Sequence, residues 1–217
     1  MKAEVKELPL FPLPVVLFPD QTLPLRIFEP RYLVMINRCV ENKEPFGVVM
    51  VKEDEPDQPS NVGTSVRVTH IERLESGLLN INTVGVERFR IESSQTGADG
   101  YLIGDVVDYP LDVRTPIPPT LIQSITHRLK RYLIYLARAN SVQFKLDQLP
   151  RTARDLALFT AIALPIELED KQELLEQSEL INLLEMEGAL LRYEVDMISL
   201  VENAIKPPQD AHMFSRN

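Results

Sequence analysis

Six of the chain's 17 prolines stand within its first thirty residues, and this is the feature that most restricts how the chain can fold. They are Pro9, Pro12, Pro14, Pro19, Pro24 and Pro30. Proline has no backbone N–H, so it cannot donate a hydrogen bond to a sheet. We therefore predict an extended, edge-like segment that turns near Pro14 and at Pro19-Asp20, and not a regular central strand.

Residues 46–109 predict strands, because five short runs there are rich in β-branched and aromatic side chains. The runs are 46–51, 62–74, 78–84, 86–93 and 101–109. Several alternate apolar and polar residues, as half-buried antiparallel strands do. Hairpin turns are expected at 75–77 and 96–100, where glycine is present. Five or six such strands suggest a small barrel or a sandwich.

One helix is expected among these strands. It opens at Glu29-Pro30, where proline suits an early helical position. Apolar residues recur on one side at helical spacing, and Cys39 lies on that side. We interpret this single cysteine as a core residue and not as a reactive thiol.

The second half of the chain predicts helices. A proline-rich linker at 110–120 marks the boundary, and helices are expected at 120–139, from Thr152 to just before Pro165, from near Asp170, and from Ser178 to about Ile205. Thr152 and Asp155 have the spacing of a capping box. The expected division is residues 1–112 as a strand-rich subdomain, 113–205 as a helical subdomain and 206–217 as a flexible tail.

Charge is distributed unevenly, with a net value of −9. Residues 167–202 carry eleven acids and two bases, whereas residues 120–166 carry seven bases and two acids. We predict two helices of opposite sign packed near each other, with the acids of 167–202 on a solvated surface. The overall charge disfavours a polyanionic nucleic acid, although a binding role for the basic helix at 120–139 stays open.

No catalytic, cofactor or metal site is predicted. The chain lacks a P-loop, a GxGxxG loop, an HExxH pair and a serine in a glycine-flanked elbow. Its three histidines (His70, His127 and His212) are not spaced as metal ligands, and one cysteine excludes a multi-cysteine site. No apolar run is long enough to span a bilayer and no secretory signal is visible, so a cytoplasmic protein is expected.

Three stretches resemble the N-terminal domain of the Lon protease family. Residues 8–32 resemble its leucine- and proline-rich opening, residues 83–91 (TVGVERFRI) resemble its glycine-then-arginine step, and residues 163–198 resemble its helical part. The resemblance implies an α+β fold. That fold is a PUA-like antiparallel β barrel with one inserted helix, followed by a C-terminal helical bundle.

The same resemblance implies a non-catalytic polypeptide-binding module, because the chain reaches Asn217 without the ATPase and serine–lysine protease domains of full-length Lon. The implied partners are unfolded or degron-bearing polypeptides, with a separate ATP-dependent protease and a homo-oligomer left open. An apolar groove beside the proline-rich segment is the expected contact. Its candidate residues are Leu13, Val15, Leu17, Phe18, Leu23, Arg26 and Arg31.

Two other functions remain as alternatives. An RNA-binding PUA-like module would need a basic face with exposed aromatic side chains, and the chain has no tryptophan. An enzyme with an unrecognised small-molecule site would need a pocket of converging polar groups, for which the sequence offers no cluster.

Overall fold

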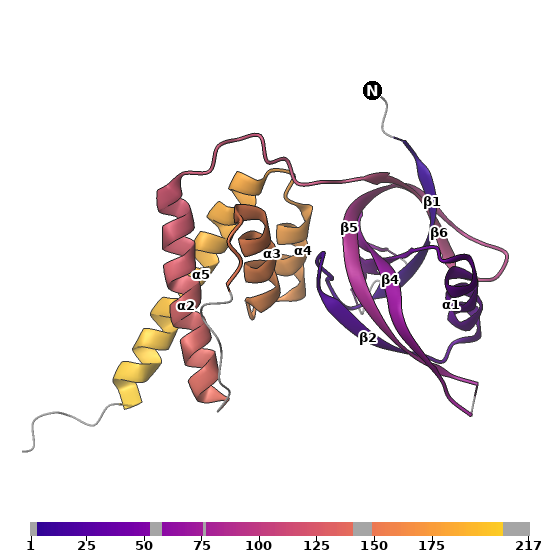
Figure 1. Cartoon of the computed structure of the whole chain (residues 1–217), viewed down its shortest axis with the longest axis horizontal. Helices are drawn as coiled ribbons and strands as arrows, with labels where there is room; N and C mark the ends of the chain where they lie inside the picture. Colours follow the sequence, from indigo (N-terminus) through magenta and orange to yellow (C-terminus); the bar gives the residue numbers. More distant parts are fainter. Residues whose placement is uncertain (1–3, 53–57, 76, 141–148, 206–217) are drawn as a thin grey trace, which may run out of the picture.

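The computed structural model describes residues 4–52, 58–75, 77–140 and 149–205, with side chains placed as far as Val201. The expected tail at 206–217 lies outside these residues, as do residues 53–57, 76 and 141–148. The described part contains a six-stranded mixed sheet and five helices, so the α+β expectation is confirmed. Figure 1 shows the strands and the first helix in one part of the molecule and the other four helices in a second part.

The sheet is mixed because one of its strand pairs is parallel. Its strands are β1 (Lys6–Leu13), β2 (Thr22–Ile27), β3 (Phe46–Met50), β4 (Val62–Arg73), β5 (Leu79–Thr96) and β6 (Leu102–Asp108). Their order is β2-β5-β4-β3-β1-β6, and β5 also pairs with β6. The pairings therefore run in a cycle through β5, β4, β3, β1 and β6, with β2 as an edge strand. An all-antiparallel sheet was expected, but β1 and β3 are parallel because β2 and helix α1 (Pro30–Asn42) form a crossover between them.

Strand β1 is central, so the prediction of an edge-like N-terminal segment is wrong for β1, although it holds for β2. It pairs with β6 over residues 6–10 and with β3 over residues 10–13, and the two ladders overlap only at Leu10. Pro9 therefore has a neighbour only in β6, and Pro12 has one only in β3. The nitrogen of each proline, which carries no hydrogen, can therefore face the side on which that residue has no partner strand. This arrangement allows a central strand to contain both prolines.

The turn at Pro19-Asp20 is confirmed and explains a second difference from expectation. Asp20 has a positive φ of 66°, and its N–H donates to the Gly85 carbonyl at 2.9 Å. The Gly85 N–H donates in turn to the Gln21 carbonyl at 2.9 Å. A Cβ on Gly85 would lie 2.3 Å from the Phe18 carbonyl oxygen, so only glycine lets residues 18–21 pass this close to β5. We call this contact the Gly85 crossing. The sequence predicted that Gly85 separates two strands, but Gly85 lies inside the single long strand β5.

The remaining local predictions of the strand part are confirmed. Gly77 (φ 80°) and Gly100 (φ 81°) turn the β4–β5 and β5–β6 hairpins, although Ser76 itself lies outside the described residues. Helix α1 has Pro30 in its first turn and buries Cys39 at 2 % exposure. Burial raises the pKa of the Cys39 thiol to about 11, which makes it an unreactive core side chain.

The second part consists of four helices around an apolar core. They are α2 (Pro119–Ala139), α3 (Ala153–Ala163), α4 (Leu168–Glu176) and α5 (Leu180–Ile205). The basic α2 packs along the acidic α5, as predicted from their charges. The Thr152 hydroxyl accepts a hydrogen bond from the Asp155 N–H at 3.1 Å, which confirms the predicted cap. Helix α4 starts two residues before the expected Asp170, without a side-chain cap.

Candidate functional site

The seven residues proposed from the sequence divide into three groups. Leu13, Val15 and Leu23 are half-buried and pack against one apolar cluster beneath α1. In contrast, Leu17 and Phe18 are buried at 2 % and 1 % exposure, so they offer almost no surface to a partner. They are the residues at the Gly85 crossing, where the Thr64 hydroxyl also donates to the Leu17 carbonyl.

The two arginines of the proposed rim, Arg26 and Arg31, are exposed. Arg26 lies on the edge strand β2, and Arg31 lies in the first turn of α1. Arg31 forms an exposed ion pair with Glu29 at 2.9 Å, and its guanidinium lies over the Tyr32 ring. Arg26 therefore precedes the first residue of α1 by four positions, and Arg31 is the second residue of that helix.

A feature that sequence reasoning missed is the open edge of β4. Strand β4 pairs with β3 only from Thr64 to Val66, because β3 begins at Phe46. Residues 67–73 pair with β5 on one side, and no backbone hydrogen bond links them to any other segment of the described chain. This stretch, the β4 edge, leaves main-chain donors and acceptors available on the side of α1.

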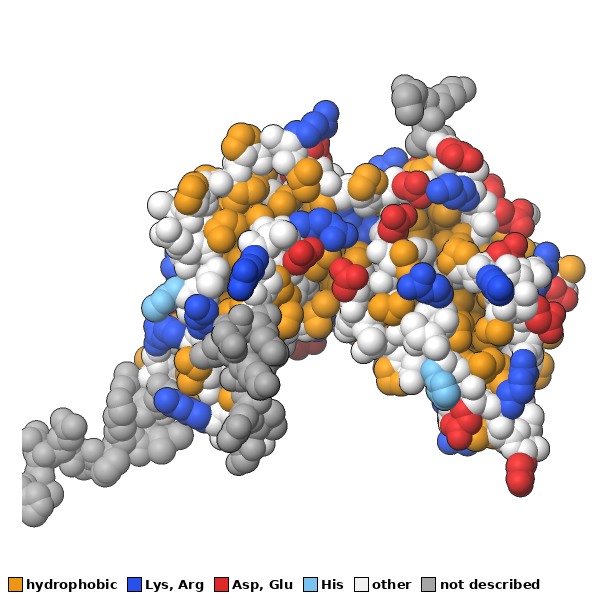
Figure 2. All heavy atoms as spheres, viewed as in Figure 1, with side chains coloured by type: hydrophobic (Ala, Val, Ile, Leu, Met, Phe, Trp, Pro, Cys, Tyr) orange, Lys and Arg blue, Asp and Glu red, His pale blue; other side chains and the backbone are white. Residues whose placement is uncertain are grey.

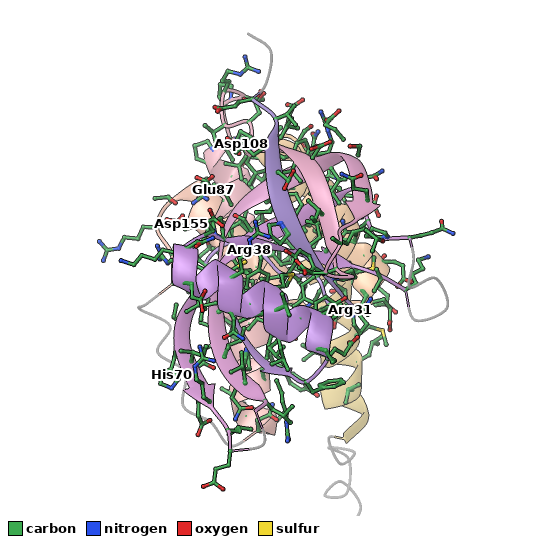
Figure 3. The ribbon with its side chains drawn as sticks, turned by 90° about the vertical axis from the view of Figure 1, so that its right-hand side faces the viewer. Arg31, Arg38, His70, Glu87, Asp108 and Asp155 are labelled. Atoms are coloured by element: carbon green, nitrogen blue, oxygen red, sulfur yellow. The ribbon has the colours of Figure 1, made fainter. Side chains whose placement is uncertain are left out.

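A cavity of about 500 Å³ lies between this edge and the end of α1, and we call it the α1–β4 groove. From α1 and the two residues after it come Cys39, Val40, Lys43 and Glu44, and from β4 come residues 67–71. Figure 3 shows His70 on β4 beside α1, away from the end that carries Arg31. Arg73 donates to the Asn37 side-chain oxygen at 2.9 Å, which ties the far end of the edge to α1.

The junction between the two parts contains polar side chains that bond to main-chain carbonyls, beside an apolar cluster that joins Val16, Phe18 and Met50 to the four helices. Arg88 of β5 is buried, and its Nη1 donates to the carbonyls of Leu175 and Gln177 at 2.6 and 2.7 Å, at the end of α4. Gln172 donates to the Val62 carbonyl, and the Tyr109 hydroxyl donates to the Glu176 carbonyl, both at 2.9 Å. The bonds of Arg88 and Tyr109 satisfy carbonyls that the end of a helix leaves without partners, whereas Gln172 bonds to a carbonyl of β4.

Burial lowers the pKa of Arg88 to about 10, so the guanidinium is charged at neutral pH. It also faces the Tyr109 ring at 5.0 Å. A cavity of about 230 Å³ lies beside it, lined by residues of both parts that include Glu87, Asp108 and Arg154. Figure 2 shows charged side chains of both signs along the hollow between the two parts.

Glu187 is the exception to the predicted acidic surface of 167–202. It lies on α5 at 0 % exposure, between Leu184 and Leu191, which are also fully buried. Neither of its carboxylate oxygens has a hydrogen-bond partner. Desolvation raises its pKa well above the usual value, so the carboxyl favours its neutral form. Its position in the i, i+4 apolar row with Leu191 was the sequence signal for burial.

Neither a metal cluster nor a membrane-crossing helix occurs in the described residues. No group of three or more His, Cys, Asp or Glu side chains there is arranged to hold a metal ion. His70 and His127 are exposed, and His212 lies outside the described residues. None of the described helices combines the length and apolar character that a bilayer crossing requires.

Residues 7–192 match the family model of the ATP-dependent protease La (LON) substrate-binding domain. The chain belongs to this family. Similar curated proteins include the Lon proteases of Desulforamulus reducens, 24 % identical over 208 residues, and of Escherichia coli K12, 24 % identical over 217 residues. These matches cover 92 % and 94 % of the chain but only 25 % and 27 % of the relatives. The chain therefore spans about a quarter of the length of the Lon proteases that it matches.

Two solved structures of Lon domains have the same fold. A Lon N-terminal domain protein from Xanthomonas campestris is 29 % identical, with a TM-score of 0.66, and the match covers 83 % of this chain and 95 % of that one. The N-terminal domain of Mycobacterium avium complex Lon protease is 15 % identical, with a TM-score of 0.65 and coverage of 86 % and 98 %. The resemblance to the Lon N-terminal domain stated from the sequence is therefore confirmed.

Proposed function

We propose that this chain is a non-catalytic module that binds polypeptides in an unfolded or extended state. The observation that carries the proposal is the match of residues 7–192 to a substrate-binding domain. The strand part supports it, because β2 and the end of β4 each have a strand edge that pairs with no other strand of the described residues. Extended chains bind such edges through main-chain hydrogen bonds.

The architecture that we propose for this role is a PUA-like barrel over residues 1–112 and a helical bundle over 113–205. The cyclic pairing of β5, β4, β3, β1 and β6 supports the barrel. The shared apolar core of α2, α3, α4 and α5 supports the bundle. In this arrangement the barrel provides the binding edges, and the bundle holds its position through the bonds of Arg88 and Gln172.

At the N-terminal segment, we propose that a partner contacts those of the seven candidate residues that are accessible at the surface. Leu13, Val15 and Leu23 supply half-buried apolar surface, and Arg26 and Arg31 supply charge at its rim. Leu17 supports this surface from beneath, because it is buried in the same apolar cluster, whereas Phe18 packs in the cluster of the helical part. A partner would therefore meet a small apolar area with a cationic border, and not a deep apolar cleft.

Fluorescence anisotropy with a labelled, permanently unfolded polypeptide tests the proposal. The full chain should bind the polypeptide saturably, and the native form of the same polypeptide should not compete. The double variant Arg26→Glu/Arg31→Glu should weaken binding, whereas Lys130→Glu, an exposed change on α2, should not. Absence of saturable binding, or retention of labelled RNA but no polypeptide in a low-salt gel shift, would contradict the proposal.

A further inference from the structure

We propose that the α1–β4 groove binds one extended polypeptide segment with acidic side chains, which joins the β4 edge as an additional strand. This inference rests on the proposed function and adds to it a second contact with its own chemistry. Three observations carry it: the lining of the groove, the direction of the backbone groups along β4, and the charges at the groove's border.

The lining shows that the groove meets the edge of β4 and not one of its faces. Residues 67–71 are consecutive, and all five line the cavity. Successive side chains of a strand point to opposite faces. A cavity that contacts five residues in succession therefore runs along the line of backbone groups between the two faces. An extended chain is the ligand that such a line of donors and acceptors fits.

The hairpin register shows which backbone groups are available. The Leu74 N–H donates to the Leu78 carbonyl at 2.9 Å, and Glu72 lies opposite Asn80. In an antiparallel ladder, directly opposed residues alternate between bonded and non-bonded pairs. Ile71 and Arg73 are therefore the non-bonded positions, and their N–H and C=O groups point away from β5, toward the groove side.

A bulge limits how long the added segment can be. The register of β4 and β5 shifts between Val68 and His70, and the Thr69 hydroxyl donates to the Asn82 carbonyl at 3.0 Å. Bulges interrupt regular pairing and protect edges from long, unspecific addition. We therefore expect a short added strand next to Ile71 and Arg73, with its side chains extending along the groove toward Lys43.

The charges that line the groove favour acidic side chains in the polypeptide segment that binds there. The groove's lining carries two basic side chains, Lys43 and Arg67, and one acid, Glu44. Neither Lys43 nor Arg67 forms an ion pair within the described part of the chain, and both are exposed. The floor is apolar, with half-buried Val40, Val68 and Ile71. A strand that alternates acidic and β-branched side chains matches both the border and the floor.

The test uses the full chain and three fluorescein-labelled peptides of equal length. One alternates Glu with Val or Thr, the second replaces each Glu with Lys, and the third is the first peptide with alternate backbone amides methylated. Methylation removes main-chain donors but keeps the side chains. Wild-type protein should bind the acidic peptide, and both the lysine and the methylated peptides should bind at least about tenfold more weakly.

The matched variants separate this groove from the N-terminal segment. Arg67→Glu with Lys43→Asn changes the groove border, and asparagine suits the left-handed backbone of Lys43 (φ 58°). This variant should lose about tenfold in affinity for the acidic peptide, whereas Arg26→Glu/Arg31→Glu should keep it. Circular dichroism and sedimentation check that the variants remain folded and that the signal is not self-association.

Each other result overturns the inference. Unchanged affinity of the groove variant shows that the groove is not the site, and unchanged affinity for the methylated peptide shows that no strand is added. If the Arg26/Arg31 variant alone loses binding, the proposed function stands and this inference fails. If the wild-type chain binds the unfolded polypeptide but none of the three peptides, this inference alone fails, and if it binds neither, both proposals fail.

Discussion

The two parts of this molecule use their backbone hydrogen bonds differently. In the helical part, α2 to α5 satisfy most of their main-chain groups internally and meet one another through apolar side chains. In the strand part, stability depends on ladders between residues far apart in sequence, such as Lys6 with Val106. A sheet of this kind leaves edges where the ladder stops. Binding through the main chain is therefore a property of the strand part, at β2 and at residues 67–73.

At the junction, side chains of each part form hydrogen bonds with main-chain carbonyls of the other part. Side chains from the strand part, above all Arg88 and Tyr109, bond to carbonyls at the end of α4. From the helical part, Gln172 returns a bond to Val62 in β4. The helical part is thus held against the same strands that carry the open edge. Four substitutions probe this difference between the parts, from the largest expected effect to the smallest.

Gly85→Val should have the largest effect, because it breaks a backbone crossing of the strand part. A Cβ there would lie 2.3 Å from the Phe18 carbonyl oxygen, so Phe18 or β5 must move. We expect a loss of about 3 kcal/mol or more in the free energy of unfolding, measured by urea denaturation.

Gly188→Ala on α5 is the matched control for that change. The nearest atom to its Cβ, from Ile125, is at 3.7 Å, which is an ordinary contact. We expect it to stabilise the protein by up to about 1 kcal/mol, because alanine favours a helix more than glycine does. Equal effects of the two substitutions would contradict the distinction between the parts.

Arg88→Met should uncouple the two parts. It removes two charge-assisted bonds to Leu175 and Gln177, and we expect a loss of about 3 kcal/mol. Hydrogen exchange should show α4 losing protection before the strands do. Arg192→Gln is the control, since Arg192 is exposed on α5, and should change stability by less than about 1 kcal/mol. Uniform destabilisation of all elements by Arg88→Met would show that Arg88 does not act at the junction.

Glu187→Gln should make the helical part more stable at high pH. The pKa of Glu187 is higher in the folded chain than in the unfolded one. At a pH above about 4.3, between these two pKa values, folding is therefore accompanied by the uptake of a proton. Its neutral form is fully favourable below that pH, and stability falls as pH rises toward the folded pKa. We expect glutamine to raise the free energy of unfolding by about 1–3 kcal/mol at pH 8, and by less at pH 5.

Urea denaturation at pH 5 and pH 8 checks this prediction. Glu185→Gln, an exposed change two residues earlier on α5, is the control and should show no such pH-dependent gain. Parallel pH profiles for the wild-type and Glu187→Gln proteins would mean that Glu187 is solvated or paired in solution.

Thr152→Ala should have the smallest effect and should act only on the helical part. It removes the bond from the Asp155 N–H to the Thr152 hydroxyl at the start of α3. We expect a loss of about 1 kcal/mol, seen as a lower midpoint in thermal denaturation. Serine at the same position should restore most of it, and a serine variant as unstable as the alanine one would point to lost packing of the Thr152 methyl group.

Features fixed by neighbours in sequence could be predicted from the sequence. The cap at Thr152, the proline start of α1 and the burial of Cys39 each depend on residues within one or two helical turns. The expected edge character of β1 failed for the opposite reason. Whether a proline fits a central strand depends on where two distant ladders overlap, and that overlap at Leu10 is set by β3 and β6.

The candidate site shows the same limit. Arg26 and Arg31 could be placed at the surface from sequence, but Leu17 and Phe18 have the same apolar character as Leu13 and Leu23. Only the crossing at Gly85 distinguishes which of them are buried. The β4 edge could not be found at all, because an absent pairing partner leaves no pattern in the strand itself. It follows from the start of β3 at Phe46.

Hydrogen exchange of the full chain, with and without a saturating unfolded acidic polypeptide, tests the central claim most directly. The account predicts slower exchange for the Ile71 and Arg73 amides in β4, which point away from β5. The helical part should keep its exchange rates. Saturable binding with unchanged exchange along β4, or with protection confined to α2 and α5, would contradict the account.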